Sequence, residues 1–585
     1  MVQYNPGILE HLAETGRRSL CPSSAVRINV GTSSCGLAKG AGLLRDKLAA
    51  RRDWALPVKV TGVGCLGACF AEPLIHVRLP DGRHYFFGRV DGKSLWHVIR
   101  LVEGHQPTSY LWLTAVEKEP GRLQGFSDLS ITGDRQTSLA RFFKLQRRSI
   151  SHSWGFIDPQ DIAEYIATGG YFTLRDALQQ FSPEKLRQLI TASPLLNLDD
   201  RQPPAPLEAP CMTVGSSTEL TPLELALVEN NPHHLLESLL LTGYALGFSQ
   251  AVIYIPAKHA LAAALLERAI ATAREYGLVG DHILGTDYGL EIAVAHNQTH
   301  SGGATAPHGL TLEPLQPLAH IPGLVRRAAG SGPEQPDTRV FYLSGDLKSH
   351  GFVEVPAEED LPALVQTITN KSSGSWKALQ VEFPNGTFLP FDNQTTKSAN
   401  TTGFMFHELV VLDRHRCIVD RTLAAINTQT PRYCAGSPAC ETGIAALKTK
   451  LSLLTQGQGY GGVLEEIEAI ARQVARETRC PTGCSPAQLV LSGLRYFRSE
   501  FAAHAAGYCP TIACKDLIRF EILQGKCKQC RCCYLVCPSG AVKNRKGTVR
   551  FFVDDRLCIK CGACAQTCPF GCIKPVSEAF SKHEP

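Results

Sequence analysis

The residues with the clearest chemical signature are cysteines near the end of the chain, in a spacing that occurs twice. Each run is followed by a proline, and the two runs are Cys527, Cys530, Cys533, Cys537 with Pro538, then Cys558, Cys561, Cys564, Cys568 with Pro569. In this spacing three thiolates wrap one 4Fe-4S cubane, and the fourth ligates the neighbouring cubane.

The sequence therefore predicts a ferredoxin with two 4Fe-4S clusters. One cluster would be held by Cys527, Cys530, Cys533 and Cys568, and the other by Cys558, Cys561, Cys564 and Cys537. A zinc ribbon is the alternative, but it needs two CxxC pairs and does not account for eight cysteines with both prolines.

Basic side chains accompany the ferredoxin runs: Lys526, Lys528, Arg531, Lys543, Arg545 and Lys546. They either form a docking surface for an acidic electron-transfer partner or are a solvated face, which is the commoner role of such lysines.

A second metal site is indicated just upstream. His504, Cys509 and Cys514 form a nitrogen and sulfur set, and Cys572, which the clusters do not need, could complete a tetrahedral zinc site. Buried free thiols are the alternative interpretation, and Cys532 also has no place in the two clusters.

The cysteine distribution indicates a reducing compartment. The chain has 585 residues and 22 cysteines, and sixteen of these lie between Cys434 and Cys572. The N-terminal residues lack the apolar core of a signal peptide, and clustered cysteines in a cytoplasmic chain are more often metal ligands than disulfides. We therefore expect a cytoplasmic protein.

Length and charge limit the remaining function classes. A chain of this length is expected to hold four or five domains. The formal net charge of +5 is too small to argue for nucleic acid or a membrane surface, and no apolar run approaches the length of a membrane span.

The elements that position the ligands begin with helices. Residues 411–506 have apolar positions at three- and four-residue spacing, which predicts a small helical bundle. Cys434, Ser437 and Cys440 lie at its start, and Cys480 and Cys484 follow some forty residues later.

The segments 433–443 and 479–504 resemble the flavoprotein subunit of NADH:quinone oxidoreductase, the 51-kDa family, and its relatives in soluble and bifurcating hydrogenases and formate dehydrogenases. The resemblance places Cys434, Cys440 and Cys480 on ligand positions of a further 4Fe-4S cluster. Ser437 stands where the family has its middle cysteine, so the options are ligation by Cys484, a three-iron cluster, a serine-ligated cubane, or no cluster.

The resemblance covers most of the chain, and the added ferredoxin end points to the beta-subunit type of hydrogenases and formate dehydrogenases. It implies a thioredoxin-like domain in the first hundred residues. Such domains bind a 2Fe-2S cluster through four cysteines, and here Cys35, Cys65 and Cys69 occupy expected turns with only Cys21 available as a fourth. A relic scaffold without a cluster is the alternative.

The family's FMN and NADH loops are expected to be lost in this chain. Residues 189–223 contain no glycine-rich phosphate cradle, and Cys211 is followed by Met212, Thr213, Val214 and Gly215 where the family has an acidic stretch. Gly302 and Gly303 alone are weak evidence for a phosphate loop, and a surface turn is the commoner meaning of such a pair.

The predicted fold is multidomain α/β and α+β. The expected segments are a thioredoxin-like domain (1–105), a linker (106–160), a Rossmann-like α/β domain with a degenerate FMN/NADH site (161–335), a β-grasp (ubiquitin-like) domain (336–410), the helical iron-sulfur bundle (411–506) and the bacterial ferredoxin domain (507–585).

The leading hypothesis is an electron-transfer and scaffold subunit of a larger oxidoreductase, without catalytic residues, FMN or NAD of its own. Its partners would be other redox subunits and a ferredoxin. The alternatives are a working FMN-dependent NAD(P)H dehydrogenase subunit with rebuilt cofactor loops, and a redox-silent structural subunit.

Overall fold

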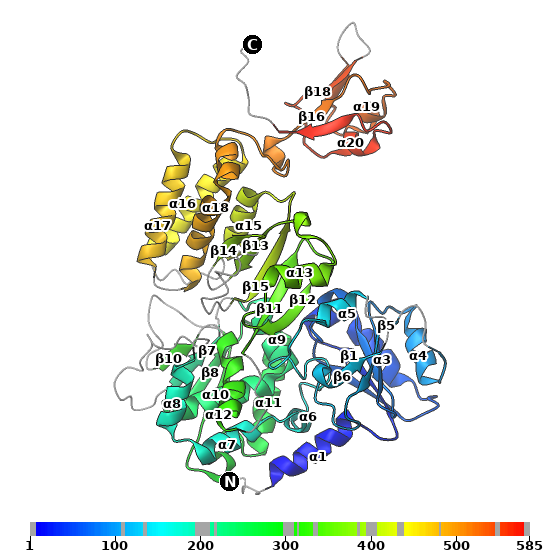
Figure 1. Ribbon diagram of the computed structural model, residues 1–585, viewed down its shortest axis with the longest axis vertical. Helices are drawn as coiled ribbons and strands as arrows, with labels where there is room; N and C mark the ends of the chain where they lie inside the picture. The colour runs from blue at the N-terminus through cyan, green and yellow to red at the C-terminus, as the bar shows by residue number, and fades with distance from the viewer. Residues whose placement is uncertain are drawn as a thin grey trace. The chain divides into compact units, whose positions relative to one another are not determined.

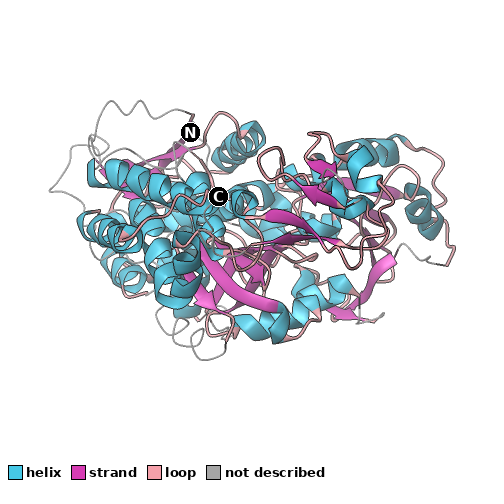
Figure 2. Ribbon diagram, turned by 90° about the horizontal axis from the view of Figure 1, so that it is seen from above, coloured by secondary structure: helices cyan, strands magenta, loops and turns pink. Residues whose placement is uncertain are grey.

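The computed structural model describes residues 7–106, 111–132, 137–193, 211–215, 219–296, 309–312, 315–330, 337–382, 386–392, 406–429, 438–478, 481–544 and 550–577. Helices and strands both occur along the whole of these ranges (Figures 1 and 2), so the fold is mixed α/β, as expected. None of the helices in these ranges is long and apolar enough to cross a membrane.

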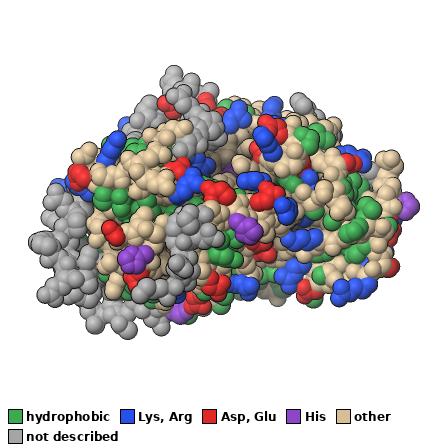
Figure 3. Space-filling view, turned by 90° about the horizontal axis from the view of Figure 1, so that it is seen from below, with side chains coloured by type: hydrophobic (Ala, Val, Ile, Leu, Met, Phe, Trp, Pro, Cys, Tyr) green, Lys and Arg blue, Asp and Glu red, His purple; other side chains and the backbone are tan. Residues whose placement is uncertain are grey.

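The chain forms two compact units. The first contains Met1–Ser373 and Asp392–Val411, and the second contains Gly374–Phe391 and Leu412–Pro585. Lys and Arg side chains are interspersed with Asp and Glu over the face drawn in Figure 3, in keeping with the small net charge of the chain.

The first unit begins with a six-stranded sheet in the order β2-β1-β3-β4-β5-β6. Its strands are β1 (Val26–Gly31), β2 (Val58–Val63), β3 (Ile75–Arg78), β4 (Arg83–Phe87), β5 (Leu111–Glu117) and β6 (Leu129–Ile131). β1 runs parallel to β2 and antiparallel to β3. A β-strand places alternate side chains on one face, so Val26, Ile28 and Val30 pack together against the helices α3 (Ala41–Ala50) and α4 (Leu95–Val102).

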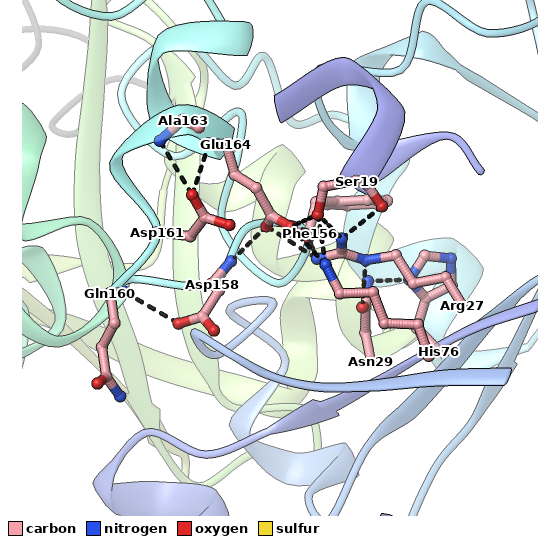
Figure 4. Close-up of polar contacts among 11 residues, drawn as sticks. Ser19, Arg27, Asn29, His76, Phe156, Asp158, Gln160, Asp161, Ala163 and Glu164 are labelled. Atoms are coloured by element: carbon pink, nitrogen blue, oxygen red, sulfur yellow. Dashed lines mark hydrogen bonds and ion pairs between the residues drawn. The ribbon is translucent and has the colours of Figure 1, made fainter. Parts of the chain in front are cut away.

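The opposite face of β1 carries a buried polar network (Figure 4). Arg27 donates to both carboxylate oxygens of Glu164, at 2.6 and 2.9 Å, and to Asn29 Oδ1 at 2.8 Å. Both charged side chains are almost fully buried, and such groups are tolerated in a protein interior when they are paired and hydrogen-bonded. The pair therefore ties the sheet to α6 (Ile162–Ala167), against which α1 (Ile8–Leu20) also packs.

The segment expected to be a linker, 106–160, is instead structured where it is described. It supplies β5 and β6, which pair antiparallel with β4 and with each other, and the helix α5 (Ser138–Phe143). Alternation of polar and apolar residues in LWLTAVE explains why this segment extends the sheet, since every second side chain is buried.

The second sheet of this unit is parallel throughout, with the order β10-β7-β8-β9. Its strands are β7 (Cys211–Val214), β8 (Gln250–Tyr254), β9 (Glu291–Ala295) and β10 (Gly309–Leu312), and the helices of this region are α7 (Phe172–Gln180), α8 (Pro183–Thr191), α9 (Pro222–Asn230), α10 (Pro232–Leu246), α11 (Ala260–Glu275) and α12 (Ile321–Ala328). α10 is apolar nearly all round and is accordingly buried nearly all round.

Residues expected to form one β-grasp domain are divided between the two units. In the first unit, β11 (Thr338–Gly345) pairs antiparallel with β12 (Gly351–Pro356) and parallel with β15 (Glu408–Asp413), and α13 (Leu361–Thr369) follows the hairpin. In the second unit, β13 (Trp376–Glu382) and β14 (Thr387–Pro390) form another antiparallel hairpin.

Four helices make up the bundle of the second unit: α15 (Ile418–Gln429), α16 (Pro438–Thr455), α17 (Val463–Glu477) and α18 (Pro481–Ala505). In α17, Leu464, Ile467, Ala471 and Val474 recur at helical spacing and are buried. This periodicity is what predicted a bundle here.

The end of the second unit is a small module of two similar halves. β16 (Arg519–Ile522) pairs antiparallel with β19 (Ile573–Val576), and β17 (Val542–Asn544) pairs antiparallel with β18 (Phe551–Val553). A short helix lies in each half, α19 (Cys532–Val536) and α20 (Ala563–Thr567), as the red end of the chain in Figure 1 shows.

Candidate metal centres

The terminal module brings the two cysteine runs into the crossed arrangement that their spacing predicted. Its small core contains Phe520, Phe551 and Ile573 together with the thiols of both runs. Cys533 lies in the first turn of α19 and Cys564 lies in α20, so each short helix carries the third cysteine of its run inward.

The first set of thiols lines a small cavity. Cys527, Cys530 and Cys533 from the first run meet Cys568 from the second run there, with Phe551 and Phe570 as apolar walls. This is the donor set of four cysteines that a cubane needs, and its fourth member comes from the other half of the module.

The second set mirrors the first. The thiol of Cys564 lies close enough to Cys558, Cys561 and Cys537 for their charges to raise its pKa, although burial is the larger cause. Cys537 belongs to the first run, so this group is also completed across the module.

Backbone amides are aimed at both crossing sulfurs. Burial acts to raise the pKa of Cys537, but hydrogen bonds from the Val542 N–H and neighbouring groups outweigh it and lower that pKa. The pKa of Cys568 is lowered in the same way by the N–H groups of Cys572, Phe570 and Gly571. Amide hydrogen bonds to thiolate favour the ligating form and tune the potential of a cluster.

A separate buried group of four donors lies in the same unit, made of Cys417, His504, Cys509 and Cys514. His504 Nε2 is 3.3 Å from the sulfurs of both Cys417 and Cys514, and these two sulfurs are 3.6 Å apart. That separation is close to the sulfur–sulfur edge of about 3.8 Å expected for tetrahedral zinc with Zn–S bonds of about 2.3 Å.

The chemistry of this group also suits a metal. The Glu500 carbonyl oxygen is 2.7 Å from His504 Nδ1, which leaves Nε2 to face the thiols. Hydrogen bonds with the Cys417 and Cys514 thiols hold the pKa of Cys509 far below its usual range even though burial opposes them. A thiolate and an oriented imidazole are what a zinc site requires.

Cys572, which the sequence placed in this group, lies elsewhere. Its sulfur is 3.3 Å from Cys568 and it lines the cavity of the first cysteine set, while Cys417 takes the expected fourth position of the zinc group. Cys572 directly precedes β19, which pairs with β16, and this pairing holds its side chain in the module core.

The N-terminal turns bring together three cysteines, Cys35, Cys65 and Cys69, whose sulfurs all lie within 4.8 Å of one another. Cys65 and Cys69 are 4.0 Å apart, and Cys65 Sγ accepts a hydrogen bond from the Gly67 N–H at 3.3 Å. Hydrogen bonds from the Cys65 and Cys69 thiols lower the pKa of Cys35 to about 4, although burial opposes them.

Cys21 does not join these three. It follows α1, and its thiol is close to Arg78 and Leu123, with a pKa that burial raises. A buried carboxylate, Glu72, is the acidic side chain that follows Cys69 instead. Burial raises the pKa of Glu72 to about 8, and the charge of Cys35 adds to this effect.

Part of the remaining sites lies outside the described residues, namely Cys434, Ser437 and Cys480 of the helical bundle and most of the loops expected to have lost FMN and NADH. Cys440 is buried in α16, and the Cys484 thiol in α18 donates to the Thr478 carbonyl oxygen at 2.7 Å. Cys211 begins β7.

Comparisons with known proteins match two regions of this chain. A family model for the NADH-ubiquinone oxidoreductase-F iron-sulfur binding region matches residues 419–504, and one for a 4Fe-4S binding domain matches residues 551–574. The first covers the helical bundle and the second covers the second cysteine run.

Relatives extend over most of the chain. The NADP-reducing hydrogenase subunit HndC of Solidesulfovibrio fructosivorans is 27% identical over 459 residues, which are 69% of this chain and 93% of the relative. The F 2 protein of the NADH-quinone oxidoreductase of Rhizobium meliloti is 25% identical over 401 residues, covering 59% and 94%. A solved NAD+-reducing NiFe-hydrogenase chain is 16% identical with a TM-score of 0.46, covering 85% of this chain and 91% of its own.

These matches define the class of protein as an iron-sulfur subunit of the NADH dehydrogenase-like oxidoreductases, with 4Fe-4S binding domains. The chain belongs to the NADH-quinone oxidoreductase F-subunit family, which confirms the resemblance seen in its sequence.

Proposed function

We propose that this chain is an electron-transfer and scaffold subunit of a larger oxidoreductase, and that it binds neither FMN nor NAD. Electrons would enter from a partner's catalytic centre and leave to a second redox module through cysteine-ligated clusters. No residue of this chain would make or break bonds of a substrate.

The crossed cysteine sets of the terminal module carry this proposal. Two 4Fe-4S clusters are proposed, one on Cys527, Cys530, Cys533 and Cys568 and the other on Cys558, Cys561, Cys564 and Cys537. Each bound cluster accepts or donates one electron at a time. The protein adjusts its potential through burial and through the N–H groups aimed at Cys537 and Cys568.

Further centres are proposed for the other donor groups. A third 4Fe-4S cluster would use Cys434, Cys440 and Cys480 with Ser437 or Cys484, a 2Fe-2S cluster would use the N-terminal cysteines, and a zinc ion would bind Cys417, His504, Cys509 and Cys514. The sheet order and strand directions of the first hundred residues support a thioredoxin-like domain there.

The test is the content of iron, acid-labile sulfide and flavin in anaerobically purified protein with its co-purifying subunits, together with low-temperature EPR after reduction. About eight or more irons per chain and no flavin on this subunit would support electron transfer without flavin. Fewer than about four irons per chain, less than a single cubane holds, would overturn the proposal.

A second candidate function is an FMN-dependent NAD(P)H dehydrogenase subunit, which is favoured by the name of the relative HndC as an NADP-reducing hydrogenase subunit. Stoichiometric acid-released flavin with NADH-driven reduction of this chain would establish it. A redox-silent structural subunit, the third candidate, would hold zinc but no reducible iron.

The proposed partners are other redox subunits of one complex and a ferredoxin, and the proposed compartment is the cytoplasm. Co-purification under anaerobic conditions followed by identification of the bound subunits tests the first. Fractionation of the native cells tests the second.

A further inference from the structure

The N-terminal metal group lacks one ligand. Cys35, Cys65 and Cys69 supply three sulfurs, and the fourth cysteine that the sequence offered, Cys21, lies elsewhere. Both zinc and each iron of an iron-sulfur cluster take four donors, so a three-donor group needs a fourth side chain.

Glu72 is the side chain placed to supply it. It follows the short helix Cys69–Ala71, its exposed fraction is 3%, and its carboxylate is hydrogen-bonded with the Cys65 thiol. Its Oε2 also accepts a hydrogen bond from the Leu74 N–H at 2.8 Å, which fixes the side chain beside the sulfurs.

Two glycines of the first turn leave room for this carboxylate. A Cβ added at Gly31 would lie 2.9 Å from Glu72 Oε1, and one added at Gly36, next to Cys35, would lie 3.2 Å from Oε2. Both distances are shorter than ordinary carbon–oxygen contacts. The carboxylate therefore sits against the same turn that presents Cys35.

The group also lacks positive charge. Among the residues that the structure describes, no Lys or Arg forms an ion pair with Glu72, and the Lys39 ammonium is hydrogen-bonded to the Cys69 carbonyl oxygen at 2.9 Å. A buried carboxylate beside thiolates is costly unless it is paired with a cation or coordinates a metal. A bound metal would remove that cost.

We propose that Glu72 is the fourth ligand of an N-terminal metal centre with three sulfur donors and one oxygen donor. The inference rests on the proposed function insofar as it makes this centre part of the electron path. The donor set suits a 2Fe-2S cluster and equally a single zinc ion, and metal analysis separates the two.

Glu229 offers a matched control. It is also a largely buried glutamate near Cys35, but its Oε2 accepts from the Ser34 N–H at 2.8 Å and its Oε1 from the Ser34 hydroxyl. Both of its oxygens are thus engaged by the backbone and side chain of Ser34. Its loss should leave the metal in place.

The experiment compares the full-length parent with Glu72→Gln, Glu72→Cys, Glu229→Gln and Cys35→Ser, all purified anaerobically with their co-purifying subunits. Iron, sulfide and zinc are measured per chain, and EPR is recorded at temperatures where 4Fe-4S signals are broadened away but 2Fe-2S signals remain. Glutamine keeps the size and the acceptor for Leu74 but is a poor ligand.

We expect Glu72→Gln and Cys35→Ser to lose about two irons and two sulfides, or about one zinc, per chain. Glu72→Cys should keep the metal and, for a 2Fe-2S cluster, shift its g values towards those of an all-thiolate cluster. Glu229→Gln should match the parent.

Unchanged metal content and spectra in Glu72→Gln would overturn the assignment, and so would a Cys35→Ser variant indistinguishable from the parent. If Glu72→Gln does not fold, a Glu72→Cys protein with unshifted signals overturns it instead. Loss of the 4Fe-4S signals in the parent would refute the proposed function and leave the Glu72 result to be judged on its own.

Discussion

At the scale of single residues, His504 organises its metal group. Because the Glu500 carbonyl occupies one ring nitrogen, the other faces the thiols of Cys417 and Cys514. An imidazole fixed in this way binds metal without first losing rotational freedom, which raises affinity.

Cys417→Ser should remove the zinc ion, from about one per chain to none, because oxygen replaces a sulfur in a site of three sulfurs and one nitrogen. Metal analysis by mass spectrometry measures the loss, and the thermal midpoint of the second unit should fall with it because metal binding contributes to folding.

Cys572→Ser is the matched control, since that thiol lies beside Cys568 rather than beside His504. It should keep its zinc. The opposite outcome, zinc lost with Cys572 and kept without Cys417, would restore the donor set expected from sequence.

A carboxylate in the first sheet should make that unit sensitive to acid. Glu117 accepts from Arg78 Nε at 2.7 Å and contacts His84 Nε2 at 3.3 Å. Burial acts to raise the pKa of Glu117, but these hydrogen bonds outweigh it and lower that pKa from 4.5 to about 2. The folded state therefore gains stability from the charged form above pH 4.5 and loses it as the pH falls through about 2.

Hydrogen exchange of the amides that join β4 and β5 measures this effect. In the parent their protection should fall between pH 4.5 and about 2, whereas Glu117→Gln should start lower and change less across that window. Glu119→Gln, at an exposed pair with Arg122, is the control and should follow the parent. Parallel pH profiles for Glu117→Gln and the parent would contradict this account.

Local spacing limits what could be predicted about the sites. His504, Cys509 and Cys514 are close along the chain, so their grouping could be predicted, but Cys417 reaches them only because α15 packs against α18. In the same way Glu72 could not be distinguished from a surface glutamate until the two N-terminal turns were placed side by side.

At the scale of elements, the terminal module depends on exchange between its halves. Each short helix carries a buried cysteine of its own run, while Cys537 and Cys568 follow the helices and reach the other set. Neither half therefore holds a complete donor set.

Cys568→Ser should abolish the cluster of the first run although it belongs to the second run. We expect the loss of about four irons per chain and of one of the two 4Fe-4S signals in EPR, with the second set of thiols still loaded. Cys532→Ser is the control, because that thiol contacts only the Cys530 carbonyl oxygen among the hydrogen bonds described. A cluster on the second run lost in place of the first would refute the crossed arrangement.

Periodicity predicted some elements well and missed others for physical reasons. The apolar spacing of α17 and the paired cysteine runs are local patterns, so the bundle and the terminal module could be expected from sequence. β5 and β6 were expected to be linker because their pairing with β4 joins residues distant along the chain. The split of residues 336–410 between two units likewise depends on packing that no local pattern records.

At the scale of the whole molecule, redox chemistry and folding should be separable. The terminal module belongs to the second unit, whereas the parallel sheet and the N-terminal sheet belong to the first. A lesion in a cluster ligand should thus leave the first unit folded.

Cys530→Ala should stop electron transfer through the subunit while leaving the first unit intact. Electron transfer is measured with the assembled complex and its natural donor, and folding by hydrogen exchange of the parallel sheet. We expect transfer to fall at least about tenfold, because a cubane with one missing thiolate is lost or changes potential. Transfer at the parent rate would mean that electrons take another route.

The crossed donor sets also have a consequence for how the protein is made. Cys527, Cys530 and Cys533 leave the ribosome early, but their fourth partner, Cys568, is translated only after the whole of the second run has begun to emerge. Neither cluster can be closed on a partly synthesised module. Cluster insertion is therefore a late, all-or-none event in biogenesis, and any truncation before Cys568 yields a chain that no assembly machinery can load at this end.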